Sequence, residues 1–118
     1  MSRDEQERLR DIQDAITAIR EHLATTGEAP AAKKDALLHD ALLFQFVVIG
    51  EAVKHLGPET RDAAPEIPWA DIAGLRDLIA HEYFRIDIAR VLEIVERDLP
   101  PLEGAISRLR KETSPPAA

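Results

Sequence analysis

The segment from about Ala32 to Leu56 carries apolar residues on nearly every side of a predicted helix. A helix of this kind is either buried at the centre of a bundle, or it packs on its own subunit with one face and on a second subunit with another. This requirement favours an all-α chain in which the other helices surround this one. The main stripe comprises Leu38, Leu42, Gln45, Ile49, Val53 and Leu56, and Phe44, Val47 and Val48 widen it on other sides.

The remaining helices are shorter or more clearly amphipathic. Residues 3–24 carry one apolar stripe, with Ser2 as the predicted N-cap and Gly27 as the stop. Gly57 and Pro58 end the apolar helix, and one short helix is predicted within 58–63. Trp69 opens a helix to about Ala80. Asp87 caps a further helix, in which Pro100 and Pro101 either produce a kink or start another helix. The sequence therefore predicts an antiparallel bundle of four or five helices.

Length and composition place the chain in a narrow class. With 118 residues and 45% hydrophobic content, it is predicted to form one domain over residues 1–112, followed by a frayed tail at 113–118. The sequence has no Cys and a charged N-terminus, which favours a reducing, cytoplasmic location. The apolar run at 41–50 is about half of the ~20 residues that span a bilayer, so no membrane span is expected.

The formal charge of -7 argues against a protein that coats nucleic acid without specificity, because such binding needs a basic face. A focused nucleic-acid site is compatible with this charge. Arg76, Arg85 and Arg90 fall within fifteen residues, and two copies of the chain would concentrate them in one cleft. The simpler alternative is that the acidic surface only keeps a helical protein soluble.

The stretch GLRDLIAHEYFRID at 74–87 places Arg76, His81 and Tyr83 on an otherwise apolar helical pattern. Arg presents a planar charged fork to phosphate oxygens, His exchanges a proton near neutral pH, and Tyr adds a hydroxyl. In metal-independent RNA cleavage the 2'-hydroxyl attacks the adjacent phosphorus, which requires proton transfer and a cation for the developing charge. The pattern is therefore a candidate nuclease site, with His81 for proton transfer and Arg76 for charge stabilisation.

Helix geometry restricts how this site is assembled. Five helical residues turn the chain by about 500°, so Arg76 and His81 point roughly 140° apart on one continuous helix, and Tyr83 returns to the Arg76 face. Either the helix ends near Ala80 to His81, or a second subunit completes the site across a two-fold axis. We expect both effects, because Asp87 signals a new helix.

Other patterns have structural alternatives. Arg76 can simply pair with Asp77 or Asp71 while His81 caps a helix end and Tyr83 fills the edge of the core. His39 and Asp40 form an HD dyad, but His22 and His55 do not clearly supply further metal ligands, so no metal site is predicted. Glu51 and His55 lie one helical turn apart, and a buried Glu51 bonded to a neighbouring helix is expected. Trp69 is expected to anchor a helix start in the core.

The motif and its flanks resemble a known family. The spacing Arg-x4-His-x-Tyr fits the HEPN superfamily, and the chain is similar to its HepT branch over roughly residues 5 to 112. The flanking stretches that carry this resemblance are VIGEA at 48–52, APEIPWADIAGLR at 64–76, HEYFRID at 81–87 and DLPPL at 98–102. The branch usually places Asn after the Arg, where this chain has Asp77, and the extra anion is expected to weaken RNA binding.

The resemblance implies a HEPN-like homodimer that acts as a metal-independent endoribonuclease without a cofactor. The same resemblance implies that the protein is the toxin of a bacterial toxin-antitoxin pair, with Arg76 and His81 as catalytic residues and Asp77 as a supporting residue. The implied partner is an MNT-type nucleotidyltransferase antitoxin, which transfers AMP from ATP to Tyr83 and so inhibits the toxin. The alternative is an inactive HEPN module that serves a nucleotidyltransferase as a dimerisation or regulatory subunit.

Overall fold

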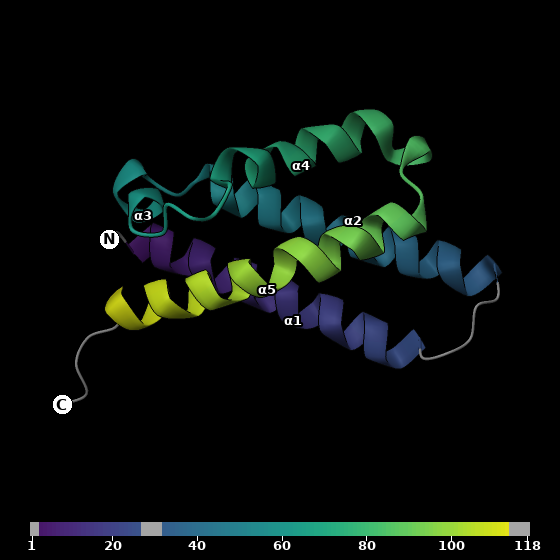
Figure 1. Cartoon of the computed structure of the whole chain (residues 1–118), viewed down its shortest axis with the longest axis horizontal. Helices are drawn as coiled ribbons and strands as arrows, with labels where there is room; N and C mark the ends of the chain where they lie inside the picture. Colours follow the sequence, from purple (N-terminus) through teal and green to yellow (C-terminus); the bar gives the residue numbers. More distant parts are fainter. Residues whose placement is uncertain (1–2, 27–31, 114–118) are drawn as a thin grey trace.

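A computed structural model of the chain describes residues 3–26 and 32–113 (Figure 1). Five α-helices and one short 3-10 helix make up these described residues. The predicted all-helical bundle is confirmed, and the helices follow one another in the predicted order. The elements are α1 (Arg3–Thr26), α2 (Ala32–Lys54), α3 (Pro58–Asp62), α4 (Trp69–Glu82), η1 (Tyr83–Arg85) and α5 (Ile88–Thr113).

Helix α2 is the central element and packs against α1, α4 and α5. Most of its predicted stripe is buried, together with the apolar stripe of α1. One face of α2 remains uncovered, however, because the side chains of Leu37 and Phe44 are 66% and 64% exposed. The predicted all-round apolar helix is therefore present, and α2 keeps an apolar face that its own chain does not cover. The fully buried side chains of this part of the core are Leu9, Ile12, Ile16, Ile19, Leu42, Ile49 and Val53.

By length and composition alone, Ala36–Lys54 within α2 is apolar enough to cross a membrane. The apolar stretch of this helix is thus longer than the ten-residue run at 41–50, from which no membrane span was expected. Core helices of bundles have the same length and composition, and α2 occupies that position here. The three helices that pack on it cover part of its apolar surface, and Leu37 and Phe44 remain exposed.

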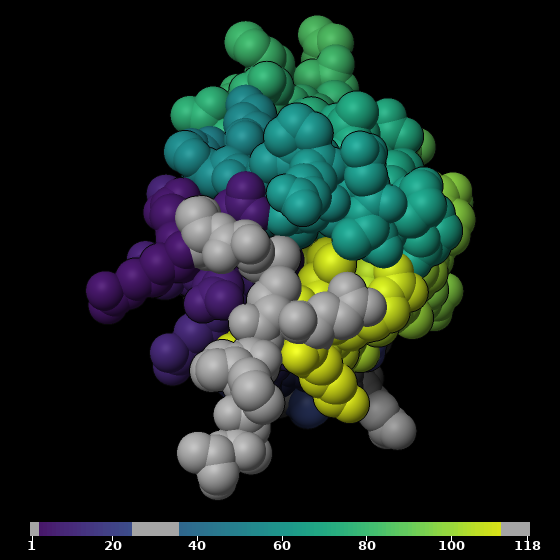
Figure 2. Space-filling view, turned by 90° about the vertical axis from the view of Figure 1, so that its left-hand side faces the viewer, coloured from purple at the N-terminus to yellow at the C-terminus, as the bar shows by residue number. Residues whose placement is uncertain are grey.

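The turn after α2 is held by the first helix. Helix α2 ends at Lys54, two residues before the predicted Leu56, because the chain tightens there through a bond from the Leu56 N–H to the Val53 carbonyl. The carboxylate of Glu5 accepts hydrogen bonds from the Gly57 N–H, at 3.0 Å, and from the Thr60 hydroxyl. Figure 2 shows the start of α1, the α3 region and the end of α5 gathered at this end of the molecule.

Helix α4 begins at Trp69, as predicted. The indole is buried and its N–H donates to the carbonyls of Arg61 and Ala64, at 3.1 and 2.9 Å. Because these carbonyls belong to the end of α3 and the turn after it, the indole ties the connecting segment to the first turn of α4. Trp69 is thus the core anchor that the sequence predicted, and it fixes where the motif-bearing helix starts.

Helix α5 continues through Pro100 and Pro101, and no new helix begins there. Its N-cap is Asp87, whose carboxylate accepts the Arg90 N–H at 2.9 Å, as predicted. Pro100 and Pro101 remove two backbone donors inside the helix. Leu99 and Leu102 on either side of them are buried, so packing holds the helix together across the prolines. The predicted tail begins one residue too early, since Thr113 belongs to α5, while 114–118, Ser2 and Gly27 lie outside the described residues.

Candidate nuclease site

The approach of α4 to α2 determines where Arg76 lies. A Cβ atom placed on Gly50 of α2 would meet the Arg76 backbone nitrogen and the Ile72 carbonyl oxygen, each at 3.1 Å. Both neighbours are backbone atoms, so neither can move aside as a flexible side chain would. Gly50 therefore allows the two helices to lie unusually close, and this contact positions Arg76 beside the last turns of α2.

Arg76 takes part in a charged network between α4 and α2. Its Nε lies 2.9 Å from the Glu51 carboxylate, and its Nη1 donates to Asp77 at 3.3 Å. Lys54 also donates to Asp77, at 3.4 Å, and His55 lies 3.5 Å from Glu51. The network has two carboxylates and two permanent cations, so a phosphate that binds Arg76 must compete with Glu51 and Asp77.

One alternative for this network is present, and one expectation needs correction. Asp77 pairs with Arg76, which is one of the two pairings that the sequence left open, because the long Arg side chain bends back around the helix to the short carboxylate. Glu51 bonds to the neighbouring helix as expected, but it is half-exposed instead of buried. Asp71 is not a partner of Arg76 and lies on another side of α4.

His81 lies in the last turn of α4 and is exposed. Among the described residues, its side chain has no hydrogen bond or ion pair. Helix α4 continues to Glu82, so the predicted break near Ala80 comes two residues later than expected. The helix is unbroken between Arg76 and His81, which leaves the two side chains roughly 140° apart within one chain.

Tyr83 is the first residue of η1 and is held by a polar cluster on α2. Its hydroxyl donates to the Asp40 carboxylate, and the His39 Nδ1 lies 3.1 Å from the same carboxylate oxygen. The His39 Nε2 donates to the Ile86 carbonyl, and the His39 ring meets the Tyr83 ring edge-on with centroids 5.6 Å apart. The neighbouring Phe84 side chain is 97% exposed.

The cluster shifts the acidity of two of its members. Hydrogen bonding to the Tyr83 hydroxyl, and then to His39, lowers the pKa of the Asp40 carboxyl from its ordinary value. The same hydrogen bond to Asp40 is the main cause that raises the pKa of Tyr83, and partial desolvation adds to it. Asp40 is therefore ionised and Tyr83 is a neutral phenol over the whole range near neutral pH.

The acidic partners of the motif were not identified from the sequence. Asp40 and Glu51 are eleven residues apart, which places them on one face of α2 within about 20°. Arg76 lies on α4, and Tyr83 lies at the start of η1, directly after α4 ends at Glu82. The sequence gives no sign of which carboxylate meets which of these two residues until the pairing of α2 with α4 is known.

The HD dyad has a different role from the one its pattern suggests. His39 bonds to the Ile86 carbonyl and Asp40 to Tyr83, so both side chains join α2 to the segment after α4. Within the described residues, no group of three or more His, Asp or Glu side chains is arranged to hold a metal ion. The dyad is accordingly a tether for the motif tyrosine.

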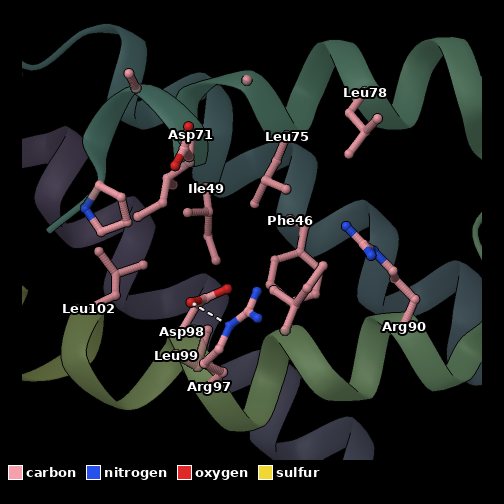
Figure 3. Close-up of a pocket in the computed structure, with 15 residues that line it drawn as sticks. Phe46, Ile49, Asp71, Leu75, Leu78, Arg90, Arg97, Asp98, Leu99 and Leu102 are labelled. Carbon is pink, nitrogen blue, oxygen red and sulfur yellow. Dashed lines mark hydrogen bonds and ion pairs between the residues drawn. The ribbon is translucent and has the colours of Figure 1, made fainter.

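A cleft of about 400 Å³ lies between α4 and α5 (Figure 3). Leu75 and Leu78 of α4 face Arg90 and Arg97 of α5 across it, above a floor that includes Phe46 of α2. None of the motif residues Arg76, His81 and Tyr83 lines this cleft. Arg90 of α5 lines this cleft and Arg76 does not, and the predicted concentration of arginines between two copies of the chain stays a prediction.

The geometry gives this surface distinct chemical capacities. Arg76 and the nearby Lys54 are exposed cations suited to phosphate oxygens, and His81 is an accessible imidazole for proton transfer. Tyr83 presents a partly exposed hydroxyl with a carboxylate already bonded to it. Within one chain, Arg76 and His81 do not converge on a common point, so a complete nuclease site needs a further contribution.

Comparison with known proteins adds a family assignment. The family described as Ribonuclease HepT-like matches residues 12–109. A candidate RNase of Caldanaerobacter subterraneus subsp. tengcongensis is 39% identical over 67% of this chain and 71% of its own length. A candidate ribonuclease HepT of Thermococcus cleftensis is 34% identical over 94% of this chain and its whole length. No solved structure matches the chain.

A further relative has a second activity in its name. A protein of Methanocaldococcus jannaschii, named as a gamma-glutamylcyclotransferase and candidate RNase, is 36% identical over 64% of this chain. The match spans only 34% of that relative's length. The similarity therefore concerns a single part of that longer protein.

Proposed function

This chain belongs to the HepT-like ribonuclease family, and on that premise we propose that it is a metal-independent endoribonuclease acting through Arg76 and His81. The observation that carries the proposal is the state of His81, an exposed imidazole in the last turn of α4, on the same unbroken helix as an exposed Arg76. An accessible imidazole at this position can exchange a proton with a phosphodiester bound beside the helix end.

The proposed reaction is an attack of the ribose 2'-hydroxyl on the adjacent phosphorus. The O2'–P bond forms and the P–O5' bond breaks, leaving a 2',3'-cyclic phosphate and a 5'-hydroxyl. A base removes the 2' proton, an acid protonates the leaving O5', and Arg76 stabilises the charge on the phosphoryl oxygens. DNA lacks the attacking hydroxyl and is not a substrate.

The active form in this proposal is a homodimer. Arg76 and His81 diverge by roughly 140° on α4, and a second copy across a two-fold axis supplies the missing side of the site. The uncovered apolar residues Leu37 and Phe44 on α2 support such an association, because large apolar side chains on one helix face favour burial. Two copies of His81 then serve as base and acid.

The proposed biological role is that of a cytoplasmic toxin controlled by an MNT-type nucleotidyltransferase antitoxin. The transferase adds AMP from ATP to Tyr83, which lies in η1, seven residues beyond Arg76. The added phosphodiester brings bulk and negative charge to the surface on which Arg76 receives RNA, and this opposes substrate binding. Tyr83 is the only tyrosine of the chain, so no other phenol competes for the modification.

The experiment is an RNA cleavage assay in EDTA with the purified protein. Arg76→Ala and His81→Ala are each expected to lower the rate by about 10² to 10⁴, with unchanged helix content. Arg10→Ala, which removes an exposed arginine of α1, is the matched control and retains the wild-type rate. Cleavage that appears only when a divalent metal is added would show that the mechanism is wrong.

A second candidate is an inactive HEPN module that binds a nucleotidyltransferase. The observation in its favour is the pairing of Arg76 with both Glu51 and Asp77, which occupies the guanidinium with protein carboxylates. Expression without the partner separates the two candidates. A ribonuclease arrests growth and loses this effect in His81→Ala, whereas an inactive module leaves growth unchanged in both forms.

A further inference from the structure

We propose that Asp40 accepts the proton of the Tyr83 hydroxyl when a nucleotidyl group is transferred to that oxygen, and that His39 positions Asp40 for this step. The inference rests on the proposed function, because the role of Tyr83 as AMP acceptor belongs to it. It adds a residue outside the Arg-x4-His-x-Tyr motif, on another helix, to the chemistry of the modification.

The geometry of the cluster provides the path for the proton. The Tyr83 hydroxyl already donates to Asp40 Oδ1, so the acceptor is in place before any nucleotide arrives. The His39 Nδ1, 3.1 Å from the same oxygen, and its contact with the Ile86 carbonyl hold the carboxylate against η1. Both ring nitrogens of His39 therefore have a partner, which fixes the orientation of the ring. The edge-on ring contact at 5.6 Å fixes the phenol from a second side.

The step that this arrangement serves is an in-line displacement at the α-phosphorus of a nucleoside triphosphate. The Tyr83 Oη–P bond forms while the bond from phosphorus to the pyrophosphate oxygen breaks, and pyrophosphate leaves with its electron pair. The phenolic proton passes to Asp40 Oδ1 and from there to water. The triphosphate and its metal ion are supplied by the transferase, and this chain contributes the nucleophile and the base.

The ionisation of the two groups fits a proton transfer that accompanies bond formation. The lowered pKa of Asp40 keeps the carboxylate available as an acceptor at neutral pH. The raised pKa of Tyr83 keeps the proton on the phenol in the resting protein. As the Oη–P bond forms, the phenolic oxygen becomes strongly acidic, and the proton then moves to the carboxylate that it already faces.

The Asp40 and Tyr83 side chains are accessible to a second protein, unlike groups that only link two buried elements. Asp40 is exposed, with 57% of its side chain open to solvent, and Tyr83 is partly exposed at the end of α4. Phe84 beside it is almost fully exposed, so a protein can reach the hydroxyl without unfolding η1. A group that only joined η1 to α2 would not need a carboxylate, since a neutral amide also accepts a hydrogen bond.

This difference defines the test. Asp40→Asn keeps a carbonyl oxygen that accepts the Tyr83 hydrogen bond but cannot take up the proton. Glu82→Gln, which neutralises an exposed carboxylate next to Tyr83, is the matched control. Each full-length protein is incubated with an MNT-type nucleotidyltransferase, Mg²⁺ and ATP, and AMP addition is followed by mass spectrometry. Because the chain has one tyrosine, tyrosine-linked AMP reports on Tyr83 alone.

For Asp40→Asn we expect the maximal rate of AMP addition to fall about 10²-fold or more, while the concentration for half-maximal rate changes little. Its residual rate should rise in proportion to hydroxide concentration, since the phenol must then ionise first, whereas the wild-type rate stays level near neutral pH. Glu82→Gln should behave as wild type. A merely structural Asp40 would not alter the pH profile.

Two results would overturn the inference in distinguishable ways. In the first, Tyr83 receives AMP at the same rate and with the same pH profile in the wild type and in Asp40→Asn. Asp40 then has no role in the transfer, and the proposed function stands. If the wild-type protein receives no AMP on Tyr83, both the role of Asp40 and the proposed control by the transferase are wrong, while the proposed RNA cleavage is tested by its own assay. A pH titration of the protein alone, followed by the absorbance of tyrosinate, tests the hydrogen bond without the transferase. The tyrosinate absorbance should appear at lower pH in Asp40→Asn than in wild type. An unchanged midpoint would show that Tyr83 does not contact Asp40 in solution.

Discussion

Arg76 and Glu51 form an ion pair of 2.9 Å between α4 and α2, directly beside the glycine that lets these helices approach. The pair is half-exposed on both sides, so it contributes little to stability, about 0–1 kcal/mol. Its importance lies in orientation, because it directs the guanidinium along α2 toward the exposed surface. Glu51 therefore orients the Arg76 guanidinium and would also compete for it with a phosphate that binds there.

Gly50→Ala should destabilise the protein by about 1–3 kcal/mol and lower RNA cleavage, because the new Cβ meets backbone atoms of Ile72 and Arg76. The control is Gly74→Ala, in which the added Cβ meets nothing within 4 Å. This second variant should gain about 0.5–1 kcal/mol from helix propensity. Urea unfolding midpoints at constant slope measure both changes, and equal effects from the two substitutions would contradict the close helix contact.

Asp77→Asn should raise RNA affinity and cleavage by about 2- to 5-fold, since it releases Arg76 and Lys54 from a shared exposed carboxylate. The gain should shrink at high ionic strength because salt screens the same interaction. Asp71→Asn, which neutralises an exposed carboxylate of α4 at the cleft, is the control for net charge. A slower Asp77→Asn enzyme would mean that Asp77 orients the cations productively.

The Asp40 and Tyr83 contact should stabilise the fold over a defined pH window. The folded pKa of Asp40 is lowered, so its contribution is complete above the ordinary value of 3.8 and is lost as pH falls through the folded value. The folded pKa of Tyr83 is raised, so its contribution is complete below 10.0 and is lost as pH rises through the folded value. The unfolding midpoint of Tyr83→Phe should therefore differ from wild type between these limits and converge with it in acid.

Phe44→Glu should convert the proposed dimer to a monomer without loss of helix content, because it places a charge on the uncovered face of α2. Leu78→Glu, at a partly exposed apolar position beside the cleft between α4 and α5, is the matched control and should remain dimeric. Light scattering at micromolar concentration gives the masses. A monomeric wild-type protein would exclude the shared site but not the fold.

The helices and the core could be predicted from the sequence because their signals are local. The α1 stripe, the Asp87 cap and the Trp69 start each depend on residues within one or two turns, and all three are confirmed. The apolar surround of α2 left open whether the helix is wholly buried or keeps a free face, and the exposed Leu37 and Phe44 show that a face is free within one chain. The prolines of α5 left two alternatives open, because only the burial of flanking leucines decides that the helix continues.

The pairs within the site could not be predicted, since they depend on how two helices align. The alternation of charges along α4 gives no sign that Arg76 meets Glu51, and it did not decide between Asp77 and Asp71 as a partner of Arg76. The HD dyad was considered only as a metal pattern, while its partner Tyr83 lies 43 residues away in sequence. A one-turn change in the alignment of α2 with α4 would give different partners from the same sequence.

The start of α1 and the end of α5 lie at one end of the bundle, and η1 with Tyr83 lies at the other (Figure 1). A surface or a bead attached through either end of the chain would therefore hold the protein with its tyrosine pointing into solution. Immobilised in this way, every molecule presents the same face to a transferase or to an RNA that flows past. An affinity tag at either terminus would therefore leave the end of the bundle that carries Tyr83 accessible in single-molecule and surface-based measurements.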